Sequence, residues 1–168
     1  MNEMAEINQK AWELAASAMV SRNGGLEAYS TSQIRKIMSA AGSQGFLQEI
    51  LRVVRNYIPA PPQNVNPNLA QKQIREKTQK NAEFGQRLTQ MIGNQDFYYV
   101  QKLMRYTLWN IKIIEKSVKN RNKLEKILNC EGVSEKGKIV SMIEPMIQAN
   151  NNPTKNDERQ GFKKNIRR

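Results

Sequence analysis

Residues 96–119 read DFYYVQKLMRYTLWNIKIIEKSVK, and this segment predicts one long helix with two unlike faces. At about 100° per residue, seven mainly apolar residues fall on a single arc of roughly 100°. These residues are Phe97, Val100, Met104, Thr107, Ile111, Ile114 and Val118. A regular apolar arc of this width is typical of a helix that packs against others in a bundle.

A second arc of the same segment is cationic and carries two aromatic rings. It has a similar width and is centred roughly 140° from the apolar arc. It holds Tyr98, Lys102, Arg105, Trp109, Lys112, Lys116 and Lys119. Because Lys and Arg attract phosphates and rings stack on bases, we expect this face to bind a nucleic acid. Two alternatives stay open: a solvated lysine-rich face without a partner and, for Trp109, burial against a neighbouring helix or subunit.

The charge of the whole chain supports an anionic partner. Lys and Arg number 27 against 15 Asp and Glu, so the formal net charge is +12. The excess is uneven, because residues 1–32 are net acidic whereas residues 102–126 hold eight cations and two anions. A basic helix can also bind an anionic membrane, but its apolar face must then be free for lipid. The regular apolar arc favours burial instead, so we expect no membrane partner.

The residues that are missing exclude most catalytic chemistry. The chain has no histidine, which removes the commonest general base, the Ser/His and Cys/His nucleophile pairs and the usual transition-metal ligand. Asn23-Gly24-Gly25 lacks the spacing and the lysine of a phosphate-binding loop, and we interpret it as the end of a helix. We therefore expect no catalytic residue, no metal and no cofactor. A catalytic site built from Glu, Lys and Tyr is the least favoured alternative.

The sequence also predicts where the protein works. No run of residues approaches the roughly 20 apolar residues that a membrane span needs. The polar start Met1-Asn2-Glu3-Met4 is unlike a signal peptide. A single cysteine, Cys130, cannot form an internal disulfide and agrees with a reducing compartment. We expect a cytoplasmic protein.

Helical periodicity throughout the chain predicts an all-α fold, a bundle of about five to seven helices without a sheet. Expected helices cover about 5–20, 30–41, 46–58, 67–92 and 96–119, followed by a shorter one that contains Leu124, Ile127 and Leu128 and a last one from about Ser134. The bundle spans residues 1–149 and includes a proline-rich loop at 59–68. Pro145 should kink the last helix or end it early. Residues 150–168 form a basic Asn/Lys-rich tail that we expect to be disordered.

Two segments near the amino terminus resemble a known family. They are Ala11-Trp12-Glu13-Leu14-Ala15 and, after a glycine-containing turn, Tyr29-Ser30-Thr31-Ser32-Gln33-Ile34-Arg35-Lys36-Ile37-Met38. The pattern is similar to that of the small helical subunit of CRISPR effector complexes, above all the type III-A subunit. The resemblance covers about residues 8–58. Small subunits made from the end of a type I-D large subunit share the architecture, so the subtype stays open.

This resemblance implies a non-catalytic bundle in an antiviral ribonucleoprotein. Such subunits associate head to tail, contact other effector subunits and hold the guide RNA and the target strand, RNA or DNA, by the backbone. By position, it implies a backbone contact at Arg35 and Lys36. From the sequence itself we expect Arg52 and Arg55 also to contact nucleic acid, because they lie three residues apart on one side of the predicted third helix. The alternative is a free-standing architectural protein that binds nucleic acid alone.

Overall fold

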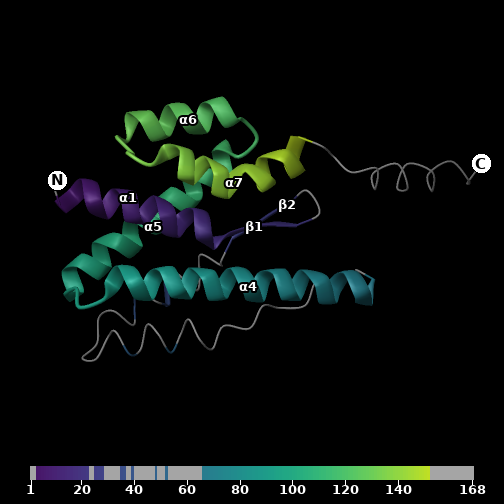
Figure 1. Cartoon of the computed structure of the whole chain (residues 1–168), viewed down its shortest axis with the longest axis horizontal. Helices are drawn as coiled ribbons and strands as arrows, with labels where there is room; N and C mark the ends of the chain where they lie inside the picture. The colour runs from purple at the N-terminus through teal and green to yellow at the C-terminus, as the bar shows by residue number, and fades with distance from the viewer. Residues whose placement is uncertain are drawn as a thin grey trace, which may run out of the picture.

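A computed structural model describes residues 3–22, 25–28, 35, 36, 39, 48, 52 and 66–151 of the 168-residue chain. The elements, in chain order, are α1 (Glu3–Ala18), β1 (Met19–Arg22), β2 (Gly25–Ala28), α4 (Pro67–Ile92), α5 (Phe97–Ser117), α6 (Arg121–Cys130) and α7 (Lys136–Asn151). The predicted all-α helical bundle is confirmed, and Figure 1 shows how the helices are arranged.

The first helix, α1, is the centre of the bundle. It packs against α4, α5 and α7, and in Figure 1 it lies between α4 and the α6–α7 pair. Every residue from Ala11 to Met19 is buried, including Glu13. Four alanines and one serine in this segment let neighbouring helices approach on all sides. The sequence pattern places Ile7, Ala11, Leu14, Ala15 and Ala18 on one apolar face of this helix, and the buried surface is wider than that face.

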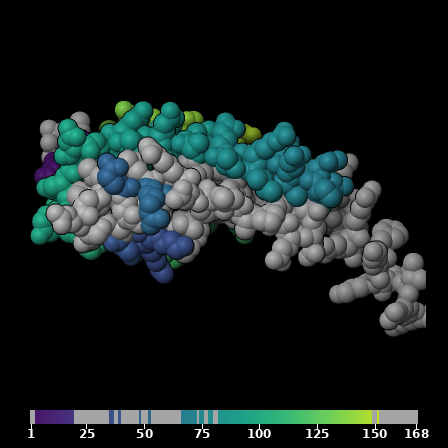
Figure 2. Space-filling view, turned by 90° about the horizontal axis from the view of Figure 1, so that it is seen from below, coloured from purple at the N-terminus to yellow at the C-terminus, as the bar shows by residue number. Residues whose placement is uncertain are grey.

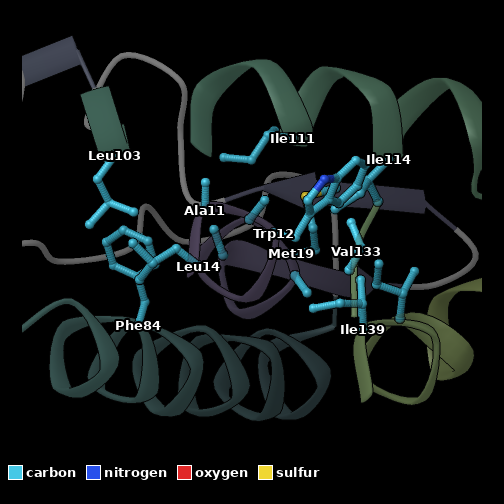
Figure 3. Close-up of a cluster of buried hydrophobic side chains, with 14 of the residues drawn as sticks. Ala11, Trp12, Leu14, Met19, Phe84, Leu103, Ile111, Ile114, Val133 and Ile139 are labelled. Atoms are coloured by element: carbon cyan, nitrogen blue, oxygen red, sulfur yellow. The ribbon is translucent and has the colours of Figure 1, made fainter. Parts of the chain in front are cut away.

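Large apolar side chains from several elements fill the core around α1 (Figure 3). Trp12 of α1 is fully buried and lies beside Ile114 of α5. Leu14 points toward Phe84 of α4. Full burial of each such side chain stabilises the fold by about 1.5 to 3 kcal/mol relative to exposure.

A short hairpin replaces the end of the predicted first helix. The expectations of a helix that reaches Val20 and of a chain without any sheet are wrong at this point, because β1 and β2 form a two-stranded antiparallel sheet. The register places Arg22 opposite Gly25, so only Asn23-Gly24 connects the strands. Asn-Gly is the dipeptide most favoured in two-residue hairpin loops. The hairpin packs against α4 and α7.

The predicted starts of the two longest helices are confirmed by their caps. The side chain of Asn66 accepts a hydrogen bond from the backbone N–H of Asn68 at 2.9 Å, and Pro67 takes the first helical position of α4. The Asp96 carboxylate accepts one from the backbone N–H of Tyr99 at 2.8 Å. A carboxylate there also interacts favourably with the positive end of the α5 dipole.

The turn after α6 sets the direction of α7. Gly132 has a φ of 66°, in the left-handed region that favours glycine. The Val133 N–H donates to Leu128 O at 3.0 Å and the Gly132 N–H donates to Asn129 O at 3.1 Å. This pair of bonds is the Schellman motif, and the buried side chains of Val133 and Leu128 accompany it.

The last helix, α7, does not end at Pro145. It continues to Asn151, two residues into the segment predicted as a tail. A proline removes one backbone hydrogen bond, here the bond to the carbonyl of Ser141 four residues earlier. Ser141 and Pro145 are both exposed, so water can solvate that carbonyl. The loss of the bond is thereby offset.

Most of the predicted second and third helices lies outside the described residues. Five of their residues are described, and all five are helical and exposed: Arg35, Lys36, Ser39, Gln48 and Arg52. The segment 59–65 of the proline-rich loop and the tail beyond residue 151 also lie outside. No helix in the described ranges is long and apolar enough to cross a membrane.

Candidate functional site

The two faces predicted for α5 are present in the structure. Six of the seven residues on the apolar arc are buried, and the seventh, Phe97, is half-buried. The buried face is wider than predicted, because α5 packs against α6 as well as α1. It also includes Tyr99, Leu103, Asn110 and Ser117.

The cationic arc is exposed along its whole length. We call the following set the basic ridge: Tyr98, Lys102, Arg105, Trp109, Lys112, Lys116 and Lys119. The Tyr98 side chain is 70% exposed and Trp109 is 61% exposed. Trp109 is therefore not buried against any of the described helices. Its burial against another subunit, or its stacking on a base, stays a prediction.

The geometry of the ridge follows from its spacing. The six ridge residues within α5 fall on an arc of about 80°. Every α5 residue on that arc is Lys, Arg, Tyr or Trp. Tyr98 and Trp109 are about 16 Å apart along the helix axis, and Lys102 and Arg105 lie between them. The ridge thus places two cations between its two rings and three more cations beyond Trp109, all along one side of the helix.

The charges of the ridge are almost free of carboxylates. Lys102 Nζ lies 4.0 Å from Glu3 Oε1, with both side chains half-exposed or more. Among the described residues this is the only ion pair that the ridge makes. Glu115 belongs to the same helix, but it lies about 80° or more around the axis from most of the ridge. The ridge can therefore attract the anions of a ligand.

Two cations on other surfaces, Lys138 and Arg121, are paired within the protein. Lys138 Nζ lies 2.9 Å from Glu13 Oε2, and this hydrogen bond is the largest of the effects that raise the pKa of Lys138. The Arg121 guanidinium lies 2.9 Å from Glu125 and 3.0 Å from Glu144. The hydrogen bond to Glu125, followed by the charge of Glu144, raises the pKa of Arg121.

A polar network attaches the start of α5 to α1. Lys10 Nζ donates to Glu6 Oε1 at 2.6 Å and to the Tyr99 hydroxyl at 3.0 Å. The hydrogen bond from Lys10 lowers the pKa of Glu6. Burial lowers the pKa of Lys10, but the hydrogen bonds to Glu6 and Tyr99 outweigh it and the net shift is upward. This network fixes the helix from which Tyr98 projects.

The remaining predicted site residues are on other helices. Arg35 and Lys36 are adjacent, helical and exposed, as a backbone contact would require. Arg52 is also helical and exposed, whereas Arg55 lies outside the described residues. The structure brings the seven residues of the basic ridge together on one face.

A groove of about 640 Å³ lies between α6 and α7, but its charged side chains already bond to other residues that line it. Arg121 on one wall faces Glu144 on the other, and Lys136 Nζ donates to Asn129 Oδ1 at 2.6 Å. No group of three His, Cys, Asp or Glu residues that could hold a metal occurs in the described parts of the chain. Cys130 is exposed at the end of α6.

Comparison with known proteins adds no further information on the site. No protein-family model, curated protein or solved structure matches this chain.

Proposed function

We propose that the protein binds nucleic acid through the basic ridge, without catalysis and without reading sequence. The observation that carries this proposal is the exposed arc of α5 that holds only Lys, Arg, Tyr and Trp. Cations recognise the phosphates common to all sequences, and rings stack on any base. The absence of histidine from the chain favours binding over catalysis.

A nucleic acid fits the ridge better than an anionic membrane does. A helix that lies on a membrane inserts its apolar face into the lipid. The apolar face of α5 is in the core instead, where Val100, Met104 and Ile111 are fully buried. Lipid insertion would require α5 to leave the bundle.

The salt dependence of binding tests the proposal. We compare the wild type with a variant in which Lys102, Arg105, Lys112, Lys116 and Lys119 are all alanine. For two oligonucleotides of unrelated sequence, the slope of log affinity against log salt should become shallower by about 0.7 to 0.9 for each lost phosphate contact. Unchanged affinity in the fivefold variant would refute the ridge as the binding site.

A control variant tests whether weaker binding comes from lost contacts at the ridge or from the loss of positive charge anywhere on the surface. Arg121→Gln removes an exposed cation that two carboxylates already neutralise. Its salt slope should equal that of the wild type. The melting temperature of the fivefold variant should also change little, because exposed charges contribute little to stability.

We further propose that the protein is the small subunit of a CRISPR-type effector complex. This rests on the resemblance over residues 8–58, and the exposed helical positions of Arg35 and Lys36 are compatible with it. The test is co-purification of the tagged chain from its native host. An effector subunit should be recovered with a guide RNA, larger proteins and further copies of itself. Recovery of the chain alone, still binding nucleic acid, would favour the free-standing architectural protein.

A further inference from the structure

The first half of α4 extends beyond the part of the helix that packs in the core. Phe84, Leu88 and Ile92, all in its second half, are buried. In the first half, up to residue 80, every described side chain is exposed or half-buried. Figure 1 shows this half at the end of the molecule away from the turn between α4 and α5. Core packing therefore does not explain the composition of this half.

The outward face of α4 is rich in amides and cations. Exposed polar residues fall on an arc of about 100° opposite the buried face. They are Asn68, Gln71, Lys72, Arg75, Gln79, Gln86, Thr89 and Gln90. No carboxylate occurs on this arc, and the nearest described one, Glu83, is half-buried at its edge and accepts a hydrogen bond from Gln79. Figure 2 shows α4 as a continuous strip along the surface.

Positive charge is concentrated in the extended half. Residues 67–80 contain four cations and one glutamate. Lys72 and Arg75 are exposed, lie three residues apart on the outward arc and make no ion pair with any described residue. Like most cations of the basic ridge, they have no described carboxylate beside them and can attract the phosphates of a ligand.

We propose that the outward face of α4 is a second contact surface for a long nucleic acid that is bound at the basic ridge. This inference rests on the proposed function. Lys, Arg and side-chain amides are the groups that contact phosphate and sugar oxygens. No exposed aromatic or large aliphatic side chain is described on this arc, so it lacks the anchors typical of protein partners. Binding here is to the backbone alone.

The length of α4 determines which ligands reach both surfaces. The midpoint of Lys72 and Arg75 lies about 28 Å along the axis from the end of α4. At 3.4 Å per stacked nucleotide, that distance corresponds to about eight nucleotides. Only four residues separate α4 from α5, so the Tyr98 end of the ridge lies near the end of α4. A stacked 6-nucleotide strand at that end of the ridge does not reach Lys72 and Arg75, whereas a stacked 30-nucleotide strand does. The second surface therefore contributes mainly to the binding of long strands.

The test measures binding of 6-nucleotide and 30-nucleotide strands to the full chain and to the double variant Lys72→Ala/Arg75→Ala. The 30-mer should show a salt slope shallower by about 1.4 to 1.8 in the variant, from two lost contacts. The affinity of the 6-mer should change much less than that of the 30-mer. The charge-conserving variant Lys72→Arg/Arg75→Lys should restore 30-mer binding.

The control variant Lys126→Gln/Lys136→Gln removes the same net charge from α6 and α7. If it weakens 30-mer binding as much as the α4 variant, net charge explains the effect and the second surface is refuted. Unchanged 30-mer binding in the α4 variant, together with weakened binding in the fivefold ridge variant, refutes the second surface and retains the proposed function. If neither variant alters binding, both proposals fail.

Discussion

The basic ridge and the α1–α7 contact use the same kind of side chain in opposite surroundings. Lys138 has a half-exposed side chain that pairs with the buried carboxylate of Glu13 at 2.9 Å, and Arg87 lies 3.9 Å from the same carboxylate. The ridge lysines at 112 and 116 are also exposed but pair with no described residue. The placement of carboxylates, more than the number of lysines, therefore decides which cations stabilise the fold and which are free to bind a ligand.

The largest expected effect separates two neighbouring residues of α5. Ile111 is fully buried, whereas Lys112 is exposed on the ridge. Ile111→Ala should lower the free energy of unfolding by about 2 to 5 kcal/mol, through lost transfer energy and a cavity. Lys112→Ala should change it by less than about 0.5 kcal/mol. Denaturant unfolding of the two variants measures both, and similar losses would contradict the two-faced description of α5.

The sequence predicts the features that depend on residues close together in the chain, but not the contacts between distant residues. The two faces of α5 and the starts of α4 and α5 follow from residues a few positions apart, and these predictions are confirmed; Asn66 and Asp96 cap the two starts. The pairing of Glu13 with Lys138 joins residues 125 positions apart, so no local pattern reveals it. Glu13 lies in the alanine-rich segment of α1, and a glutamate in such a segment indicates a buried carboxylate that needs a cation beside it.

The hairpin shows a different limit. Asn23-Gly24 favours both the end of a helix and a two-residue hairpin loop, and the residues on either side do not decide between them. Packing against α4 and α7 accompanies the hairpin in the structure. The exposure of the basic ridge is predictable from helical periodicity. The identity of a ligand is not, because the same exposed lysines and rings suit any nucleic acid.

The second prediction concerns the aromatic component of the ridge. Trp109→Ala should weaken nucleic-acid binding by about 1 to 3 kcal/mol, the loss of one stacked base. Trp109→Phe should retain most of the affinity because it keeps a ring. Titration with a fluorescent oligonucleotide measures both variants. Since Trp109 is 61% exposed, the melting temperature should stay near that of the wild type, and a large decrease would contradict a stacking role.

The third prediction tests the paired cations. Glu13→Gln should lower the free energy of unfolding by about 1 to 3 kcal/mol, because Lys138 and Arg87 lose their shared carboxylate. Its affinity for nucleic acid should be unchanged, since neither cation belongs to the basic ridge. Thermal unfolding and oligonucleotide titration of the same preparation check the two parts. Weaker binding without loss of stability would contradict the separation of the two groups of cations.

The smallest expected effect is a pH dependence at the junction of α1 and α5. The hydrogen bond from Lys10 lowers the pKa of Glu6 below its ordinary value of 4.5, so ionised Glu6 stabilises the folded state. This contribution is fully present above pH 4.5 and is lost as the pH falls through the lower pKa of the folded state. Glu6→Gln should therefore reduce the melting temperature slightly at pH 7, and the difference from the wild type should disappear in acid. In a Lys10→Met background, the pH-dependent effect of Glu6→Gln should be much smaller, because the donor that contributes most to the lower pKa is gone and only the charge of the amino terminus still lowers it. A difference of undiminished size in that background would contradict the assignment of the effect to Lys10.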